Sequence, residues 1–416
     1  MTRKFFYGWR IVIAGGVTQF LQALFLQQAF GAYVSVLVEE KGWSKTALSG
    51  AAASQSVEAA ILGPILGWLT DKVGARRLIR IGAVVFGCGF LVLSQIDSLP
   101  GFYAAIITLA IGSSLCGFFP INVTVIQWFS KYRARALSGV ALGLGIGGTC
   151  TPIVAWAMDM FGWRTIAMSS AFIVMAILIP MSRVYRQRPE EIGETIDGLP
   201  AEPPRRDASG KVHVHEGPEY TLRQALRMPS FWKIAAGHSM ALSTVYAVNV
   251  HAITHMRTDM GYSLAQAGLI ITLMTFFQMI GNGTGVLIGD RFDKAMVAGL
   301  CMFLHAAGLL LLGWAGNTAM LIAFAMCHGF AWGLRGPFMN AIRADHFGRN
   351  AIGQIMGISA LITMLGQIAG PMISGGIADL TGKYEYGFTT VALIVMLGSL
   401  TFLTLGKPQP APPAGC

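Results

Sequence analysis

The stretch GWLTDKVGARR, residues 67–77, ends an apolar segment with one acid, Asp71, and three basic residues, Lys72, Arg76 and Arg77, around a glycine that favours a turn. A degenerate copy, VLIGDRFDK, occupies residues 286–294, where Asp290 matches Asp71 at an offset of 219 residues. Because that offset is about half of the 416 residues, the second half of the chain is predicted to repeat the first.

Three further pairs of loops support this repeat at nearly the same offset. Each pair shares the position of a glycine: EEKGWSKTALSGA at 39–51 with RTDMGYSLAQAGL at 257–269, WFSKYRARALSG at 128–139 with HFGRNAIGQIMG at 346–357, and DMFGW at 159–163 with DLTGK at 379–383. Four loops that recur in the same order indicate a duplicated unit, an architecture by which transporters build a central site between two bundles.

The composition is that of a membrane protein. The chain is 54% hydrophobic and only 12% charged, against about a quarter charged in soluble domains. Apolar runs of about 20 residues predict twelve transmembrane helices. They lie near 11–38, 46–69, 78–95, 102–128, 136–158, 165–183, 230–256, 264–288, 295–315, 319–342, 351–376 and 387–406. The expected fold is all-α, with two six-helix bundles related by a pseudo-two-fold axis.

Three regions follow from this pattern. We expect an N-terminal bundle over 1–183, a cytoplasmic linker over 184–228, and a C-terminal bundle with a short cytoplasmic tail over 229–416. The linker is polar and rich in proline and charge, which favours partial disorder. Its last segment, YTLRQALRMPSFW, fits either a short amphipathic helix on the membrane surface or the start of the seventh span.

The charges predict the orientation. With the N-terminus inside, 24 of the 30 Lys and Arg residues fall on the cytoplasmic side, so both termini are expected in the cytoplasm and the protein in the inner (plasma) membrane. No basic face remains that would explain the net charge of +10 by nucleic-acid binding. The apolar run after the basic start is too long for a signal-peptide core, which indicates a retained first span.

The loop at 67–77 and the internal repeat resemble the major facilitator superfamily over nearly the full length of the chain. The resemblance implies a monomeric carrier that works by alternating access. It also implies a gating cluster formed by Asp71, Lys72, Arg76 and Arg77 with Asp290 and Arg291. The alternative role for this cluster is a purely topological anchor at anionic lipid.

Two shorter stretches, YGWRIVIAGG in the first span and KGWS before the second, resemble the bacterial monocarboxylate and oxalate/formate transporter group. That resemblance implies an arginine in span eight that receives the substrate carboxylate, but Asn282 occupies the corresponding place here. Arg335 in span ten is the candidate replacement, because a planar guanidinium can hold a carboxylate through two hydrogen bonds. Alternatively, Arg335 pairs with Glu58 or reaches the interface.

Other polar residues within the spans are candidates for the site. Glu58 is the one acid deep in a span, and a buried carboxyl group can exchange protons near neutrality, although a salt bridge fits equally well. His251 is a second proton-coupling candidate and also a candidate for the outer cavity wall. The neutral wall is predicted from Gln28, Asn122, Tyr246, His251, Asn282 and Trp332, with inter-helix hydrogen bonding as the alternative role.

These features predict a secondary transporter of a small organic anion, a monocarboxylate, with possible proton symport. The nearest alternative is a proton-driven exporter of amphipathic or cationic compounds on the same fold, and a remote one is a membrane receptor or enzyme. We expect no enzyme activity, cofactor or metal, because the sequence offers no nucleophile with a base, no phosphate loop and no metal-ligand constellation. The expected partners are the substrate, a proton and the lipid bilayer.

Overall fold

The structure, a computed structural model, describes residues 5–43, 45–200, 205–206, 212–213 and 219–409. The N-terminal half consists of helices, several of them broken within one span. In chain order they are α1 (Tyr7–Gln22), the π-helix η1 (Ala23–Gln27), α2 (Phe30–Lys41), α3 (Lys45–Val73), α4 (Ala75–Ser94), α5 (Leu99–Cys116), α6 (Phe118–Trp128), α7 (Arg133–Thr149), α8 (Thr151–Phe161) and α9 (Trp163–Met181).

The C-terminal half consists of six long helices without such breaks. They are α11 (Pro229–Thr258), α12 (Leu264–Ile288), α13 (Lys294–Gly313), α14 (Thr318–Phe347), α15 (Ile352–Thr381) and α16 (Tyr384–Leu403). Between the halves lie the short elements η2 (Ser182–Val184), η3 (Pro189–Ile192), η4 (Ile196–Gly198), β1 (Arg205–Arg206), β2 (Val212–His213) and α10 (Leu222–Arg227).

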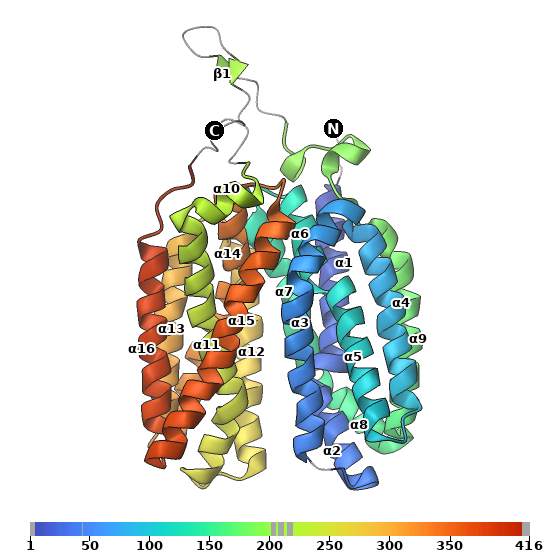
Figure 1. The fold of residues 1–416 in the computed structure, drawn as a ribbon, viewed down its shortest axis with the longest axis vertical. Helices are drawn as coiled ribbons and strands as arrows, with labels where there is room; N and C mark the ends of the chain where they lie inside the picture. The colour runs from blue at the N-terminus through green and yellow to red at the C-terminus, as the bar shows by residue number, and fades with distance from the viewer. Residues whose placement is uncertain (1–4, 44, 201–204, 207–211, 214–218, 410–416) are drawn as a thin grey trace.

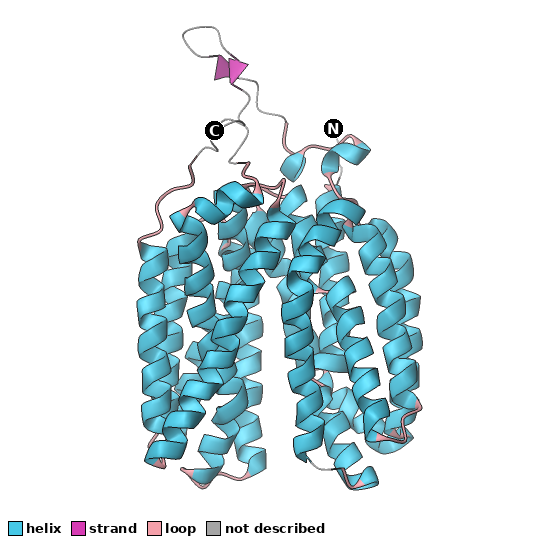
Figure 2. Cartoon of the chain, in the orientation of Figure 1, coloured by secondary structure: helices cyan, strands magenta, loops and turns pink. Residues whose placement is uncertain are grey.

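The two halves form two bundles that stand side by side, with both termini and the segment between the halves at one end (Figure 1). We call this end the linker side and the other end the open side. Outside the helices, the described residues hold a single two-stranded antiparallel pair, β1 with β2, above the bundles (Figure 2). When each broken span counts once, the described part of the chain forms twelve helical spans, as the sequence predicts.

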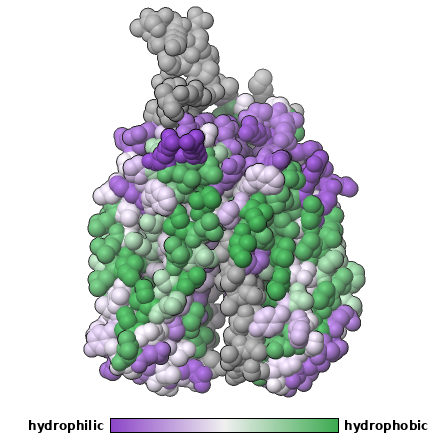
Figure 3. Space-filling view, in the orientation of Figure 1, coloured by the Kyte–Doolittle hydropathy of each residue, from purple (hydrophilic) through white to green (hydrophobic). Residues whose placement is uncertain are grey.

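The outer surface suits a bilayer. On the face shown in Figure 3, apolar side chains cover the middle of both bundles between two more polar ends. Nine of the described helical stretches are long and apolar enough to cross a membrane. Helices α3, α11 and α14 fall outside that set because each carries polar or charged residues among its apolar ones.

Small residues allow the helices to pack closely, as expected where lipid provides no hydrophobic drive for association. Gly143 of α7 lies against the backbone of Gly16 in α1, and Gly112 of α5 lies against the backbone of Phe86 in α4. A Cβ atom at either glycine would clash with that backbone. In the C-terminal half, Gly370 of α15 lies in the same way against the backbone of Ser243 in α11, so both bundles are tightly packed.

One sequence-based expectation about helix ends is wrong. The tenth span is predicted to end at 342, but α14 continues to Phe347 and Arg343 is only 4% exposed. The helix can continue because polar groups on neighbouring helices accept the Arg343 hydrogen bonds. The end of the linker forms α10, which begins with a capping box between Thr221 and Gln224, and α11 follows directly.

Candidate functional site

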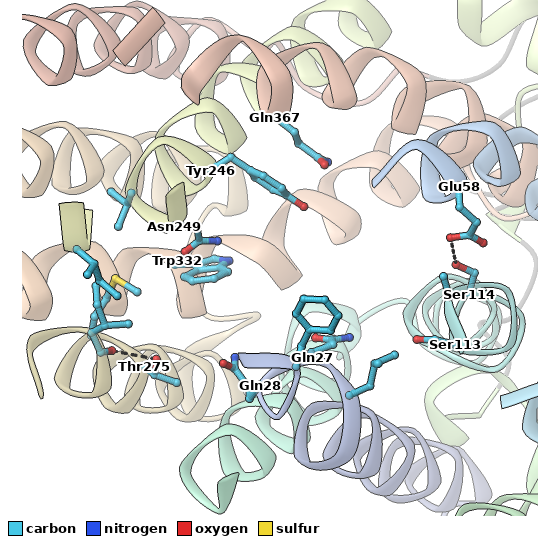
Figure 4. A pocket seen from close by; sticks show the side chains of 17 residues that line it. Gln27, Gln28, Glu58, Ser113, Ser114, Tyr246, Asn249, Thr275, Trp332 and Gln367 are labelled. Atoms are coloured by element: carbon cyan, nitrogen blue, oxygen red, sulfur yellow. Dashed lines mark hydrogen bonds between the residues drawn. The ribbon is translucent and has the colours of Figure 1, made fainter. Parts of the chain in front are cut away.

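A cavity of about 640 Å³ lies between the two bundles (Figure 4). Four helices of the C-terminal half, α11, α12, α14 and α15, and several helical stretches of the N-terminal half contribute to its wall. Its polar lining residues are Gln27, Gln28, Glu58, Ser113, Ser114, Tyr246, Asn249, Thr275, Trp332 and Gln367, and its apolar ones include Leu26, Phe30, Ile253 and Met274.

The π-helix η1 places two amides in this cavity. The backbone N–H of Gln28 donates to the carbonyl oxygen of Ala23, five residues earlier, at 3.0 Å. Such a π-turn widens the helix locally and is often found at functional sites. Here it ends α1 and orients the side chains of Gln27 and Gln28 toward the space between the bundles (Figure 4).

Glu58 of α3 is the one charged residue among the described lining residues. The Ser114 hydroxyl of α5 donates a hydrogen bond to Glu58 Oε2 at 3.2 Å, and Oε1 has no hydrogen-bond partner among the described residues. The sequence-based alternative of a salt bridge between Glu58 and Arg335 is therefore wrong. Oε1 is buried, but the residue lies at the cavity wall without a counter-charge, as a group that binds and releases a proton requires.

The opposite wall comes from the C-terminal bundle. Tyr246 and Asn249 come from α11, Trp332 from α14, and Gln367 from α15, and their polar atoms converge on the cavity (Figure 4). These side chains offer donors and acceptors without charge. Aromatic surfaces with a few convergent polar groups are typical of sites that bind small molecules.

The sequence predicted part of this wall. Gln28, Tyr246, Trp332 and Glu58 line the cavity, as their predicted roles require. Six further lining residues were not among the predicted site residues: Gln27, Ser113, Ser114, Asn249, Thr275 and Gln367. Helical periodicity alone does not show which of the many Ser, Thr and Gln residues within the spans face a cavity. In the first span, the π-turn also shifts that periodicity.

Three other predicted neutral residues lie away from the cavity, contrary to expectation. Asn282 is 3% exposed, and its amide donates to the Ala141 carbonyl of α7 at 3.4 Å, so it bridges the bundles. Asn122 is 1% exposed within its own bundle. His251 Nε2 donates to the Pro371 carbonyl of α15 at 3.0 Å. Each of these side chains is engaged in helix packing in this conformation.

Arg335 also does not line the cavity, so the expectation that it faces an open chamber is wrong for this conformation. Its side chain is 1% exposed and points into the C-terminal bundle, where Nε donates to His305 Nε2 of α13 at 3.3 Å. Since arginine can only donate, His305 carries its proton on Nδ1, which in turn donates to His328 Nδ1 at 3.1 Å. No acid pairs with Arg335 among the described residues, and its Nη1 has no partner there.

The linker side of the cavity is closed by two matching contacts across the bundles. Asp71 at the end of α3 accepts the Gln354 N–H, in the first turn of α15, at 3.2 Å. Asp290 after α12 accepts the N–H groups of Ala134 and Arg135, in the first turn of α7, at 3.0 and 3.1 Å. Each acid therefore lies at the positive N-terminus of a helix in the other half, and the repeat explains why the contact occurs twice.

An ion-pair network reinforces this closure. Asp345 of α14 pairs with Arg133 of α7 and, at 2.7 Å, with Lys294 of α13. Burial raises the pKa of Asp290, although the backbone donors of Arg135 and Ala134 and the charge of Lys294 act in the opposite direction. The structure is thus closed on the linker side and hollow on the open side.

The remaining residues of the predicted gating cluster lie at the same surface. Lys72 packs over the Trp68 ring, 4.7 Å from its centroid, and Arg76 is half-buried at the start of α4. Arg77 and Arg291 are exposed. Gly67, the first residue of the motif, lies against the backbone of Gly353 in α15, so the motif combines a close helix contact with an acid at a helix N-terminus.

Comparison with known proteins agrees with this architecture. The profile of the Major Facilitator Superfamily matches residues 15–263 and 234–415. The chain belongs to the major facilitator superfamily. It is therefore a transporter of that superfamily and not an enzyme, and the resemblance inferred from residues 67–77 is confirmed.

Individual relatives are distant. The chain is 22% identical to monocarboxylate transporter 13 of Bos taurus over 82% of this chain and 76% of that protein. It is 23% identical to the hexuronate transporter of Escherichia coli K12 over 90% of this chain and 88% of that protein. Among solved structures, the human organic anion transporter MFSD10 aligns with a TM-score of 0.75 at 15% identity, covering 95% of this chain and 99% of that chain. That likeness confirms the twelve-helix, two-bundle fold.

Proposed function

We propose that this transporter carries a small monocarboxylate together with a proton through the cavity by alternating access. The observation that supports this proposal is the charge of the wall: Glu58 is its one ionisable acid, and no Lys, Arg or His is among the described lining residues. Two carboxylates in one cavity without a cation repel each other, so one of them must hold a proton. A carboxylate substrate would therefore enter with a proton shared with Glu58.

The neutral wall favours a substrate that also carries hydroxyl groups. Gln27, Gln28, Asn249 and Gln367 offer amide donors and acceptors, and Tyr246 offers a phenol. The relatives named above transport monocarboxylates and hexuronates, and a hexuronate is a monocarboxylate with several hydroxyl groups. We therefore favour hydroxylated acids within the monocarboxylate class.

The same proposal includes orientation and organisation. The bias of positive charge supports a cytoplasmic linker side, with both termini in the cytoplasm and the protein in the inner (plasma) membrane. The proposed units are the bundles 1–183 and 229–416, joined by the linker 184–228, in a monomer. The gating roles of Asp71 and Asp290 belong to this proposal, because their contacts close the linker side.

A proton-driven exporter of amphipathic cations is the second candidate. Glu58 lies in a cavity that also exposes Phe30, Tyr246 and Trp332. A carboxylate beside aromatic faces would attract a lipophilic cation through charge and cation–π interactions. In that case the proton and the substrate would compete for Glu58 and move in opposite directions.

Transport by purified protein in liposomes separates the two candidates. Labelled lactate, glucuronate and tetraphenylphosphonium are offered with and without a pH gradient across the membrane. We expect at least one of the two acids to accumulate toward the alkaline side, with a proton moving in the same direction. Transport of tetraphenylphosphonium against the proton gradient, without transport of either acid, would establish the exporter instead.

A further inference from the structure

A second buried arginine lies on the linker-side half of the C-terminal bundle. Arg343 of α14 is 4% exposed and reaches toward two neighbouring helices. Its Nε donates to Ser359 Oγ of α15 at 3.0 Å, and its Nη2 donates to His238 Nδ1 of α11 at 2.6 Å. Its Nη1 donates to Asn340 Oδ1 at 3.1 Å. These acceptors are all neutral, and no ion pair of Arg343 occurs among the described residues.

The position of Arg343 relates it to the cavity. Trp332, Met339 and Arg343 follow one another at i, i+7 and i+11, which is the spacing of one face of a helix. Trp332 lines the cavity, and Arg343 lies eleven residues further toward the linker side, roughly 16 Å along the helix. Met339 between them is fully buried. Arg343 therefore lies on the continuation of the cavity wall, behind the closed linker side.

Neutral polar side chains would be enough to make hydrogen bonds between these helices, so packing alone does not explain a charged side chain at position 343. An ionised group in a membrane span is costly, and it normally faces a partner or a water-filled path. Arg335 adds a second guanidinium eight residues away, again without an acid among the described residues and with Nη1 unpartnered. Arg335 and Arg343 are thus two buried cations without an acid partner among the described residues, whereas the cavity holds one acid.

We propose that Arg343, with Asn340, Ser359 and His238, forms a carboxylate-binding site that the substrate reaches when the linker side opens. This inference rests on the proposed transport of a monocarboxylate. The neutral acceptors hold the guanidinium in a fixed orientation without neutralising it, so its planar fork is ready for the two oxygens of a carboxylate. The carboxylate would replace His238 and Asn340 as acceptors. The site belongs to the open linker side, whereas Glu58 serves the opposite conformation.

The site predicts that the two faces of the transporter differ in their response to one substitution. In liposomes of known protein orientation, counterflow of labelled lactate gives a separate KM for each face. We expect Arg343→Gln to raise the linker-side KM by about tenfold or more, the value of a charge-assisted fork. The open-side KM should change by less than about twofold, because Arg343 does not line the cavity.

Two further variants make the result specific. Arg343→Lys keeps the charge but loses the fork, so its linker-side KM should lie between those of the wild type and Arg343→Gln. Arg223→Gln, at an exposed arginine of α10 in the same half, is the matched control and should change neither KM. An unchanged linker-side KM in correctly folded Arg343→Gln would overturn the inference, and so would an equal rise on both faces, which indicates a packing role. If the wild type moves no carboxylate at all, the proposed function fails first and this site fails with it.

Discussion

The two halves of the transport path differ in charge. On the open side, the cavity wall holds the acid Glu58 among amides, hydroxyls and aromatic rings. On the linker side, the interior of the C-terminal bundle holds Arg335 and Arg343, each bonded to neutral acceptors. An anionic substrate would thus require a proton in one half and find a cation in the other. Because the substrate needs a proton in only one half of the path, this difference would couple proton movement to substrate movement.

Loss of the acid should produce the largest effect. We expect Glu58→Gln to abolish accumulation of lactate driven by a pH gradient, because glutamine cannot bind and release a proton. Counterflow without a gradient should continue, since the amide keeps a hydrogen-bond acceptor for Ser114. Comparing the two assays in the same liposomes checks this prediction. Accumulation at the wild-type level in this variant would show that the proton binds elsewhere.

The sequence predicted the acid side of this comparison better than the cationic side. Glu58 could be found because an acid deep in an apolar span is rare and conspicuous. Arg335 was conspicuous for the same reason, but a linear sequence does not show whether a side chain faces the gap between bundles or the interior of its own. Its contact with His305 depends on how α13 packs against α14.

The overall fold was predictable because it depends on features that are local in the sequence. Apolar runs give the spans, and the repeated loops give the two bundles. Helix ends were less predictable, and the tenth span was predicted to end just before Arg343 because charge normally marks the end of a span. The π-turn at 23–27 was not predictable from periodicity, because a single extra residue in a helical turn leaves no compositional signal.

Close helix packing on the linker side helps to separate the cavity that holds Glu58 from the region that holds Arg335 and Arg343. Gly67 of α3 lies against the backbone of Gly353 in α15, so Gly67→Ala should destabilise the closed linker side by about 1–3 kcal/mol, as overpacking does. Fluorescent labels at Lys131→Cys and Arg227→Cys, both exposed and in different halves, would report the separation of the bundles. We expect that separation to increase on the linker side.

The matched control for this glycine is Gly31→Ala in α2. A Cβ atom there would meet nothing within 4 Å, so the label separation should not change. If Gly67→Ala also leaves the separation unchanged, then α3 and α15 can adjust without opening the linker side. The two regions would in that case be separated by the acid contacts rather than by packing.

The cationic region should be less stable than an apolar one. Arg335 is buried without an acid, so we expect Arg335→Met to raise the free energy of unfolding by about 1–2 kcal/mol, measured by denaturant titration in detergent. Binding of substrate from the open side should not change, because Arg335 does not line the cavity. Weaker open-side binding would instead support the direct contact with substrate that the sequence suggested.

Arg133→Met provides the opposite case. Arg133 pairs with Asp345 across the bundles, so its removal leaves that acid with Lys294 alone. Breaking a buried pair by removing one partner destabilises a protein, and we expect the free energy of unfolding to fall. Opposite signs for the two arginines would show that charge without a partner, rather than the arginine side chain itself, distinguishes the cationic region.

The smallest expected effect is a shift of the closed state with pH. Burial against α7 raises the pKa of Asp290, and opening the linker side would return this carboxyl group to water and to its ordinary value, about 3.9. Closing therefore takes up protons. The closed fraction should be highest at low pH and should fall as pH rises from about 4 through the raised pKa. The labels at positions 131 and 227 measure this shift, and Asp290→Asn should reduce it, since asparagine does not titrate while Asp71 keeps the matching contact. A closed fraction that rises with pH would mean that the backbone donors of Ala134 and Arg135 favour the ionised carboxylate more than burial disfavours it.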